Sequence, residues 1–164
     1  MGGRCPALPV SGPGIAALQA GARAVRRRGE TDVMTRYVIG PDVAVRLAGE
    51  EAVIRGGHQL LAPALLRSQV LSLLYRAVRR GEMTRKQAER QLEYVRGLRM
   101  RLLADPVLQK FAWKAAGLLG WADTFDAEYV ALTQLHADAL ITLDRRLARA
   151  VKDLVTVEPI EALY

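Results

Sequence analysis

The chain has 164 residues, which suffices for one domain of ordinary size, and its 51% hydrophobic and 25% charged composition is typical of a folded globular protein. No apolar run reaches the ~18 residues needed to span a bilayer, so we expect no membrane segment. The single Cys5 excludes an internal disulfide and a cysteine-rich zinc site. A net charge of +7 favours a polyanionic partner such as nucleic acid.

The first 33 residues differ in composition from the rest, since Gly, Pro and Ala dominate them up to three consecutive arginines. A short helix over residues 15–28 is compatible with this segment, but a secretory signal is not, because prolines interrupt it. Met34 directly precedes the first convincing strand. We therefore interpret residues 1–33 as a flexible extension or an upstream mis-start, and residues 34–164 as the domain. The missing export signal favours a cytoplasmic location.

The first half of the domain reads as two strands and a series of helices. The predicted strands are 37–39 and 60–62, and Asp42 is expected to cap a helix over 43–48. Pro63 fits the first turn of a long helix in which apolar residues recur at helical spacing up to Gly81. Thr84 and Gln87 form a capping-box pattern that opens a helix over 85–101. Asp105-Pro106 then begins a helix over 107–119.

The last third alternates between helices and strands: helix 126–136, strand 139–142, helix 144–151 and strand 154–157. Strands separated by helices predict right-handed crossovers and a parallel sheet covered on both faces. We therefore predict an α/β three-layer sandwich with a mainly parallel sheet of four or five strands. Functional groups in such sheets gather at the carboxyl ends of the strands.

Charge is unevenly distributed along the domain. Residues 67–101 carry ten basic and three acidic side chains, a net +7, and the rest of residues 34–164 carries −3. A basic region beside an acidic one suits an enzyme that attracts phosphates and holds a divalent cation at carboxylates. A solvated helix face with intrahelical ion pairs explains any single arginine equally well.

Three aspartates lie at predicted strand ends or helix starts: Asp42, Asp126 and Asp144. Helix capping explains each one taken singly, because aspartate is favoured at helix N-termini. Capping does not explain why separate segments of one sheet bring several carboxylates together, where their repulsion is costly without a cation. Mg²⁺, or Mn²⁺ in its place, prefers such oxygen ligands and often completes its shell with substrate phosphate.

Four segments resemble the PIN domain of VapC-type toxins, in order and in spacing: TRYVIGPDVAV, LLRSQVLSLLYRAVRRGEMT, TFDAEYVAL and ALITLDRRLARAV. The resemblance covers about residues 35–160, and its most specific parts surround Asp126 and Asp144. It implies a magnesium-dependent endoribonuclease that is usually a homodimer and is held inactive by a small antitoxin. Asp126 and Asp144 match the third and fourth of four acids that line the site in that family.

Two positions depart from the family pattern. Gly40 stands where the first aspartate normally follows the strand, and Asp42 falls two residues later at a Ser or Thr position. Gln69 aligns with the second acid, normally a glutamate, and its neutral amide lowers the charge available to a metal. Asp42 could occupy the space left at Gly40 if the glycine takes an unusual backbone path. Alternatively, Asp123, one helical turn before Asp126, supplies the extra carboxylate.

These residues define the predicted mechanism, which is metal-assisted hydrolysis at Asp42, Asp126 and Asp144. Thr142 is placed to hydrogen-bond a carboxylate or a metal-bound water, although a β-branched strand residue is the simpler interpretation. Arg145 and Arg146 are placed to bind RNA phosphates.

Two other functions are compatible with parts of the sequence. A degenerate PIN module that binds RNA or a protein without cleaving is favoured by Gly40 and Gln69. A phosphoacceptor receiver domain also uses acids after strands, but it needs an acid pair near the first strand and a late lysine, and neither is evident.

Overall fold

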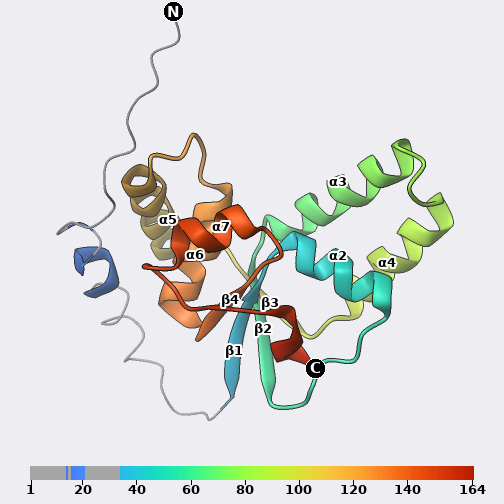
Figure 1. Cartoon of the computed structure of the whole chain (residues 1–164), viewed down its shortest axis with the longest axis horizontal. Coiled ribbons are helices and arrows are strands. Elements are labelled where there is room, and N and C mark those ends of the chain that lie inside the picture. The colour runs from blue at the N-terminus through green and yellow to red at the C-terminus, as the bar shows by residue number, and fades with distance from the viewer. Residues whose placement is uncertain (1–13, 15, 21–33) are drawn as a thin grey trace, which may run out of the picture.

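The computed structural model describes residue 14, residues 16–20 and residues 34–164. From residue 34 onward, strands alternate with single helices or helix pairs (Figure 1). The elements are β1 (Thr35–Ile39), α2 (Pro41–Glu50), β2 (His58–Pro63), α3 (Leu66–Arg79), α4 (Arg85–Gly97), β3 (Met100–Leu103), α5 (Pro106–Leu119), α6 (Phe125–His136), β4 (Ala139–Ile141), α7 (Arg145–Val151), β5 (Val157–Glu158) and a terminal 3₁₀ turn (Ile160–Leu163).

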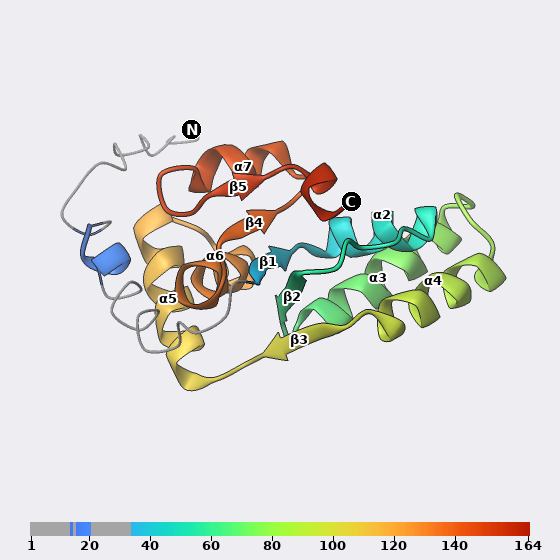
Figure 2. The same ribbon diagram turned by 90° about the horizontal axis from the view of Figure 1, so that it is seen from below.

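The five strands form one parallel sheet in the order β3-β2-β1-β4-β5. Figure 2 shows α5 and α6 on one side of the sheet and α2, α3 and α4 on the other. This arrangement confirms the predicted α/β three-layer sandwich. The sheet has five strands, where we predicted four or five. Among the described residues, no helix combines the length and the apolar character needed to cross a bilayer.

The core lies between the sheet and α6. This helix packs on β1, β2 and β4, and its residues from Tyr129 to Leu135 are all buried. Val38, Ile39, Leu140 and Ile141 in the two central strands are fully buried as well. A parallel sheet covered on both faces favours continuous apolar runs, which the sequence supplies in the second half of β1 and throughout β4. The consequence is a rigid platform beneath the loops that follow these strands.

Several predicted helix boundaries are confirmed. Thr84 and Gln87 form the complete capping box of α4, and Asp105 caps α5 by accepting a hydrogen bond from the Leu108 amide at 2.9 Å. Gly120 ends α5 with a φ of 67°, the left-handed conformation that glycine adopts without strain.

Other expectations at the edges of elements were wrong. Helix α4 ends at Gly97, and residues 100–103, which we expected to remain helical as far as 101, form the edge strand β3. Charged Arg101 conceals the strand pattern because an edge strand exposes part of its surface. Pro63 is the last residue of β2 and does not begin the next helix. The final strand is Val157–Glu158, later than the predicted 154–157.

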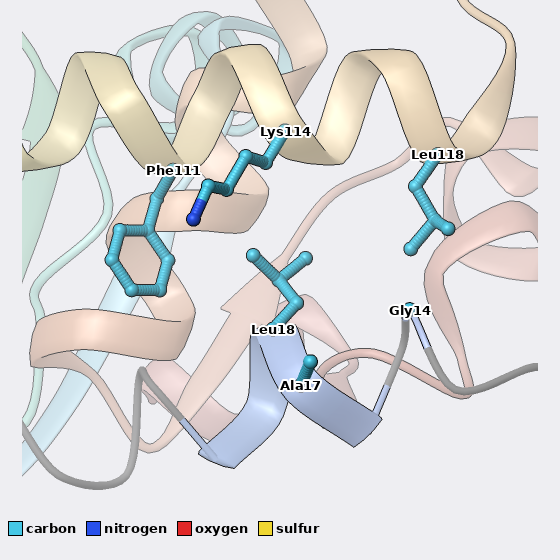
Figure 3. Close-up of a pocket in the computed structure, with 6 residues that line it drawn as sticks. All are labelled: Gly14, Ala17, Leu18, Phe111, Lys114 and Leu118. Carbon is cyan, nitrogen blue, oxygen red and sulfur yellow. The ribbon is translucent and has the colours of Figure 1, made fainter.

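Part of the predicted N-terminal extension lies against the domain. Residues 16–20 are helical, within the helix that we predicted over 15–28, and residue 14 is helical just before that range. The side chain of Leu18 is only 6% exposed and points toward Phe111, Lys114 and Leu118 of α5 (Figure 3). The Gln19 side-chain amide also donates to the Asp153 carbonyl at 2.6 Å. The rest of the predicted extension falls outside the described residues.

Candidate functional site

The candidate site lies where β1 and β4 end. These strands are parallel neighbours, so the loops that follow them meet at one edge of the sheet (Figure 1). The Gly40 amide donates to the Ile141 carbonyl at 3.0 Å and so continues the pairing of β1 with β4 up to the start of the first loop. Asp42 follows the first strand and Asp144 follows the second, so two predicted site residues enter the same region from segments about a hundred residues apart.

Asp42 joins α2 to the loop between β4 and α7. Its Oδ2 accepts hydrogen bonds from the Leu143 amide at 2.7 Å, the Asp144 amide at 3.1 Å and the Thr142 hydroxyl at 3.1 Å. Its Oδ1 accepts from the Val43 amide at 2.8 Å. The predicted capping role is therefore wrong: Gly40 is the N-cap of α2, Pro41 opens the helix, and the Asp42 carboxylate binds another loop.

Gly40 gives the Asp42 carboxylate the space it occupies. A Cβ atom at residue 40 would collide with Asp42 Oδ1. The Gly40 backbone is ordinary extended chain, with φ −75° and ψ 165°, so the unusual backbone path that we considered is not present. What the glycine contributes is the absence of a side chain. The carboxylate of residue 42 thus lies where a side chain of residue 40 would begin.

Asp144 caps α7, which is one of the two roles that we predicted for it; the other is metal binding. Its Oδ1 accepts from the Arg146 amide at 2.7 Å and the Leu147 amide at 3.2 Å, while its Oδ2 makes no hydrogen bond to any described residue. The Thr142 hydroxyl accepts from the Asp144 amide at 3.1 Å in addition to donating to Asp42. Thr142 therefore contacts a carboxylate and holds the loop that carries Asp144; it is not the strand residue that we took as the simpler interpretation, because β4 ends at Ile141.

Asp126 lies in the first turn of α6 and faces the same region. Burial raises the pKa of its carboxyl, and the negative charges of Asp144, Asp123 and Asp42 raise that pKa further. Asp126 forms no hydrogen bond or ion pair with any residue that the structure describes. A carboxylate that has no partner and is surrounded by like charges is an unfavourable group in the absence of a cation. We refer to Asp42, Asp123, Asp126 and Asp144 as the acidic site.

Asp123 contributes charge to the acidic site from the loop before α6. Its Oδ1 accepts from the Phe125 amide at 3.0 Å and so helps to shape the start of the helix. Its negative charge contributes to the raised pKa of the Asp126 carboxyl, so the two carboxylates lie within electrostatic range of each other. The charges of Asp42 and Asp123 both act on Asp126, so the two alternatives for the extra carboxylate both stay predictions.

Gln69 lies beside the acidic site and is held by Tyr129. The Tyr129 hydroxyl donates to Gln69 Oε1 at 2.6 Å, across 60 positions of sequence. Burial, followed by the charges of Asp42 and Asp126, raises the pKa of the Tyr129 phenol, so this hydroxyl remains a hydrogen-bond donor. Tyr129 is the residue whose role we missed. Its position three residues after Asp126 places it on the same face of α6, but nothing in the sequence indicated Gln69 as its partner.

The donor set of the acidic site suits a hard divalent cation. All four groups are carboxylates, and a bound cation would compensate the repulsion at Asp126. As the side chains stand, no three acidic, histidine or cysteine groups among the described residues are close enough together to hold a metal. Both oxygens of Asp42 and Oδ1 of Asp144 instead accept hydrogen bonds from backbone amides. Metal binding would require these carboxylates to share or exchange those hydrogen bonds.

Arg145 and Arg146 are exposed at the N-terminus of α7. Neither makes an ion pair within the described part of the chain. Positive charge is unfavourable at this end of a helix, because the macrodipole is positive there as well. Both arginines are therefore free to bind an anion beside Asp144, and their contact to RNA phosphates stays a prediction.

No protein-family model and no curated protein matches the chain. Among solved structures, the chain is similar to PAE2754 from Pyrobaculum aerophilum, with a TM-score of 0.64 and 23% sequence identity. The alignment covers 79% of this chain and 93% of that protein. At this identity the similarity establishes the fold.

Replacing Gln69 by glutamate is expected to strengthen Mn²⁺ binding by about tenfold. The glutamate keeps an acceptor for the Tyr129 hydroxyl and adds one negative charge beside Asp126. Calorimetric titration with Mn²⁺ would measure the change. Gln109→Glu on the exposed surface of α5 adds the same charge elsewhere and should leave the affinity unchanged. Equal affinities for wild type and Gln69→Glu would place Gln69 outside the metal site.

Proposed function

We propose that this protein is a metal-dependent endoribonuclease that hydrolyses RNA phosphodiesters at the acidic site. The observation that carries the proposal is the convergence of four aspartates on one edge of the sheet, where Asp126 makes no hydrogen bond or ion pair to any described residue. The resemblance of the sequence to VapC-type PIN domains supports the same chemistry. On that resemblance we also propose that the chain is the toxin of a toxin–antitoxin pair, forms a homodimer, binds a cognate antitoxin and acts in the cytoplasm.

Each residue of the site has a distinct task in this proposal. Asp42, Asp126 and Asp144 would hold Mg²⁺, with Asp123 adding charge. The cation supplies Lewis acidity toward the scissile phosphate and acidifies a bound water. Asp42 and Thr142 fix the loop that carries Asp144, so the distance between the carboxylates is set before substrate binds. Arg145 and Arg146 bind phosphate oxygens on the same side and orient the backbone of the RNA.

Cleavage of a structured RNA is expected in Mg²⁺ and not in EDTA. Asp126→Asn and Asp144→Asn are each expected to lower the rate by at least about a hundredfold, because each removes one charge that the metal needs. Asparagine caps helices as well as aspartate, so the second change leaves α7 intact. Full activity in both variants would remove the proposed mechanism.

A second function is favoured by one specific feature, the engagement of Asp42 and Asp144 by backbone amides. These bonds, together with the neutral Gln69, suit a PIN-like module that binds RNA or a protein without cutting. The same assay separates the two functions. Tight RNA binding without any cleavage in Mg²⁺ or Mn²⁺ would establish the binding module in place of the nuclease.

A further inference from the structure

A cavity of about 790 Å³ lies at the amino ends of β1 and β2, at the end of the sheet opposite the acidic site (Figure 1). Its volume is within the range of about 300–1,000 Å³ that is usual for small-molecule sites. Its walls are Met34, the loop from α2 to β2, the first residues of β2 and the end of α4. None of the four aspartates of the acidic site lines it, so the two sites are separate.

The loop from α2 to β2, which forms most of the wall, is held in place from two sides. The Tyr94 hydroxyl of α4 donates to the Ala52 carbonyl at 2.5 Å. The Arg55 amide donates to the Leu163 carbonyl at 2.8 Å. The shape of the cavity is therefore set by contacts of this loop with α4 and with the C-terminal turn.

His58, the first residue of β2, lines the cavity and has no polar partner. Both of its ring nitrogens are buried, and neither forms a hydrogen bond with any residue that the structure describes. The ring packs edge-on against Tyr37, with centroids 5.2 Å apart and ring planes at 72°, so an aromatic contact holds it. Buried polar groups without a partner are uncommon in native proteins and call for a functional explanation. A ligand in the cavity that accepts a hydrogen bond provides one.

Positive charge and apolar surface meet at this cavity. Arg55 and Arg99 line it, are exposed, and form no ion pair within the described part of the chain. Ile54, Leu60 and Leu98 supply apolar surface, and no acidic side chain is among the described residues of the wall. A ligand matched to this lining carries an anionic head group on an apolar body. A metal ion is not matched, because the wall offers one histidine and no carboxylate.

We propose that this cavity binds a small organic oxyanion, a carboxylate or phosphate ester on an apolar body. Arg55 and Arg99 bind the oxyanion, and the imidazole N–H of His58 donates to it the hydrogen bond that it otherwise lacks. The apolar part of the wall covers the body of the ligand. The inference goes beyond the proposed function and does not depend on it.

The test follows the two histidines of the chain by proton NMR. His58 lines the cavity and His136 does not, so the first reports binding and the second is an internal reference. The probes are 2-naphthoate and 2-naphthyl phosphate, and 2-naphthylmethanol is their neutral analogue. We expect both anions to shift the His58 signal saturably and to leave His136 unchanged. The neutral analogue should bind at least about tenfold more weakly.

Variants identify the residues that bind the anion. Arg99→Gln should lower the affinity for both anions by about tenfold. Arg90→Gln removes the same charge from an exposed position of α4 outside the cavity and should leave the affinity unchanged. His58→Phe keeps a ring against Tyr37 and removes the unpartnered nitrogens, so it should raise the melting temperature and yet weaken binding. A histidine with a structural role alone would not affect binding.

The absence of a saturable His58 shift with either anion would overturn the proposal. Equal binding of 2-naphthylmethanol would overturn it too, as would an equal loss of affinity in Arg90→Gln and Arg99→Gln. Binding of one anion and not the other would support the site and identify its head group. RNA cleavage in Mg²⁺ is scored separately and should be unchanged in His58→Phe, so a failure of the proposed nuclease and a failure of this site are distinguishable.

Discussion

Asp42→Ser is expected to lower RNA cleavage and Mn²⁺ affinity by at least about a hundredfold, and adding Gly40→Asp to it is expected to restore most of both. The reason is the space shared by the two positions. The Asp42 carboxylate lies where a side chain at residue 40 would begin, so an aspartate at 40 can place its charge nearby only after residue 42 has been shortened.

The single variant Gly40→Asp is expected to be worse than the double variant. Its Cβ atom collides with Asp42 Oδ1, and its carboxylate repels that of Asp42. Either side chain must move, and movement of Asp42 breaks its three hydrogen bonds to the loop before α7. We therefore expect a lowered melting temperature for Gly40→Asp and strong non-additivity in the double-mutant cycle.

Asp42→Asn separates charge from shape, because it keeps an oxygen for the loop amides and removes the negative charge. If the site needs the charge, this variant loses metal affinity, while its melting temperature falls only through the loss of the single bond from the Val43 amide. If the double variant folds but remains as inactive as Asp42→Ser, an aspartate at residue 40 cannot replace the one at residue 42. That result would show that Asp42 serves to hold the 142–144 loop and that the charge of the site comes from the other aspartates.

The sequence predicted the parts of the fold that depend on local pattern. The short apolar runs of β1 and β4, the capping box at Thr84 and the cap at Asp105 each have a local physical cause, and each is present in the structure. Edge strand β3 was missed because only four residues form it and Arg101 interrupts its apolar character. Its pairing with β2 is a tertiary contact, which local propensity does not encode.

The site was predictable in position but not in detail. A parallel sheet brings residues after β1 and β4 together, which placed Asp42 and Asp144 correctly. The direction of the Asp42 side chain depended on an empty space at Gly40, a property of three-dimensional packing. The bond between Tyr129 and Gln69 joins two helices far apart in sequence and had no local signature.

Asp126→Asn is expected to stabilise the metal-free protein at neutral pH while removing its stabilisation by Mg²⁺. Burial and three neighbouring carboxylates make the Asp126 charge unfavourable, as its raised pKa shows. Removing that charge should raise the melting temperature in EDTA by roughly 2–4 °C. Wild type alone should then gain stability on addition of Mg²⁺, by about 2.7 kcal/mol at a hundred times the dissociation constant. The order of the two melting temperatures is therefore expected to reverse with metal.

The pH dependence provides a control without a metal. Because the pKa of Asp126 is higher in the folded than in the unfolded chain, the folded protein takes up this proton first as the pH falls. Protonation removes the unfavourable charge from wild type. The stability deficit of wild type relative to Asp126→Asn should therefore shrink as the pH falls through the raised pKa of Asp126, and should be gone below the ordinary pKa range of aspartate. Asp144→Ala provides the opposite case, since losing the α7 cap should destabilise the protein by about 1 kcal/mol. A lower melting temperature for Asp126→Asn in EDTA would show that this carboxylate does not face its neighbours, and the acidic site would then lack its central member.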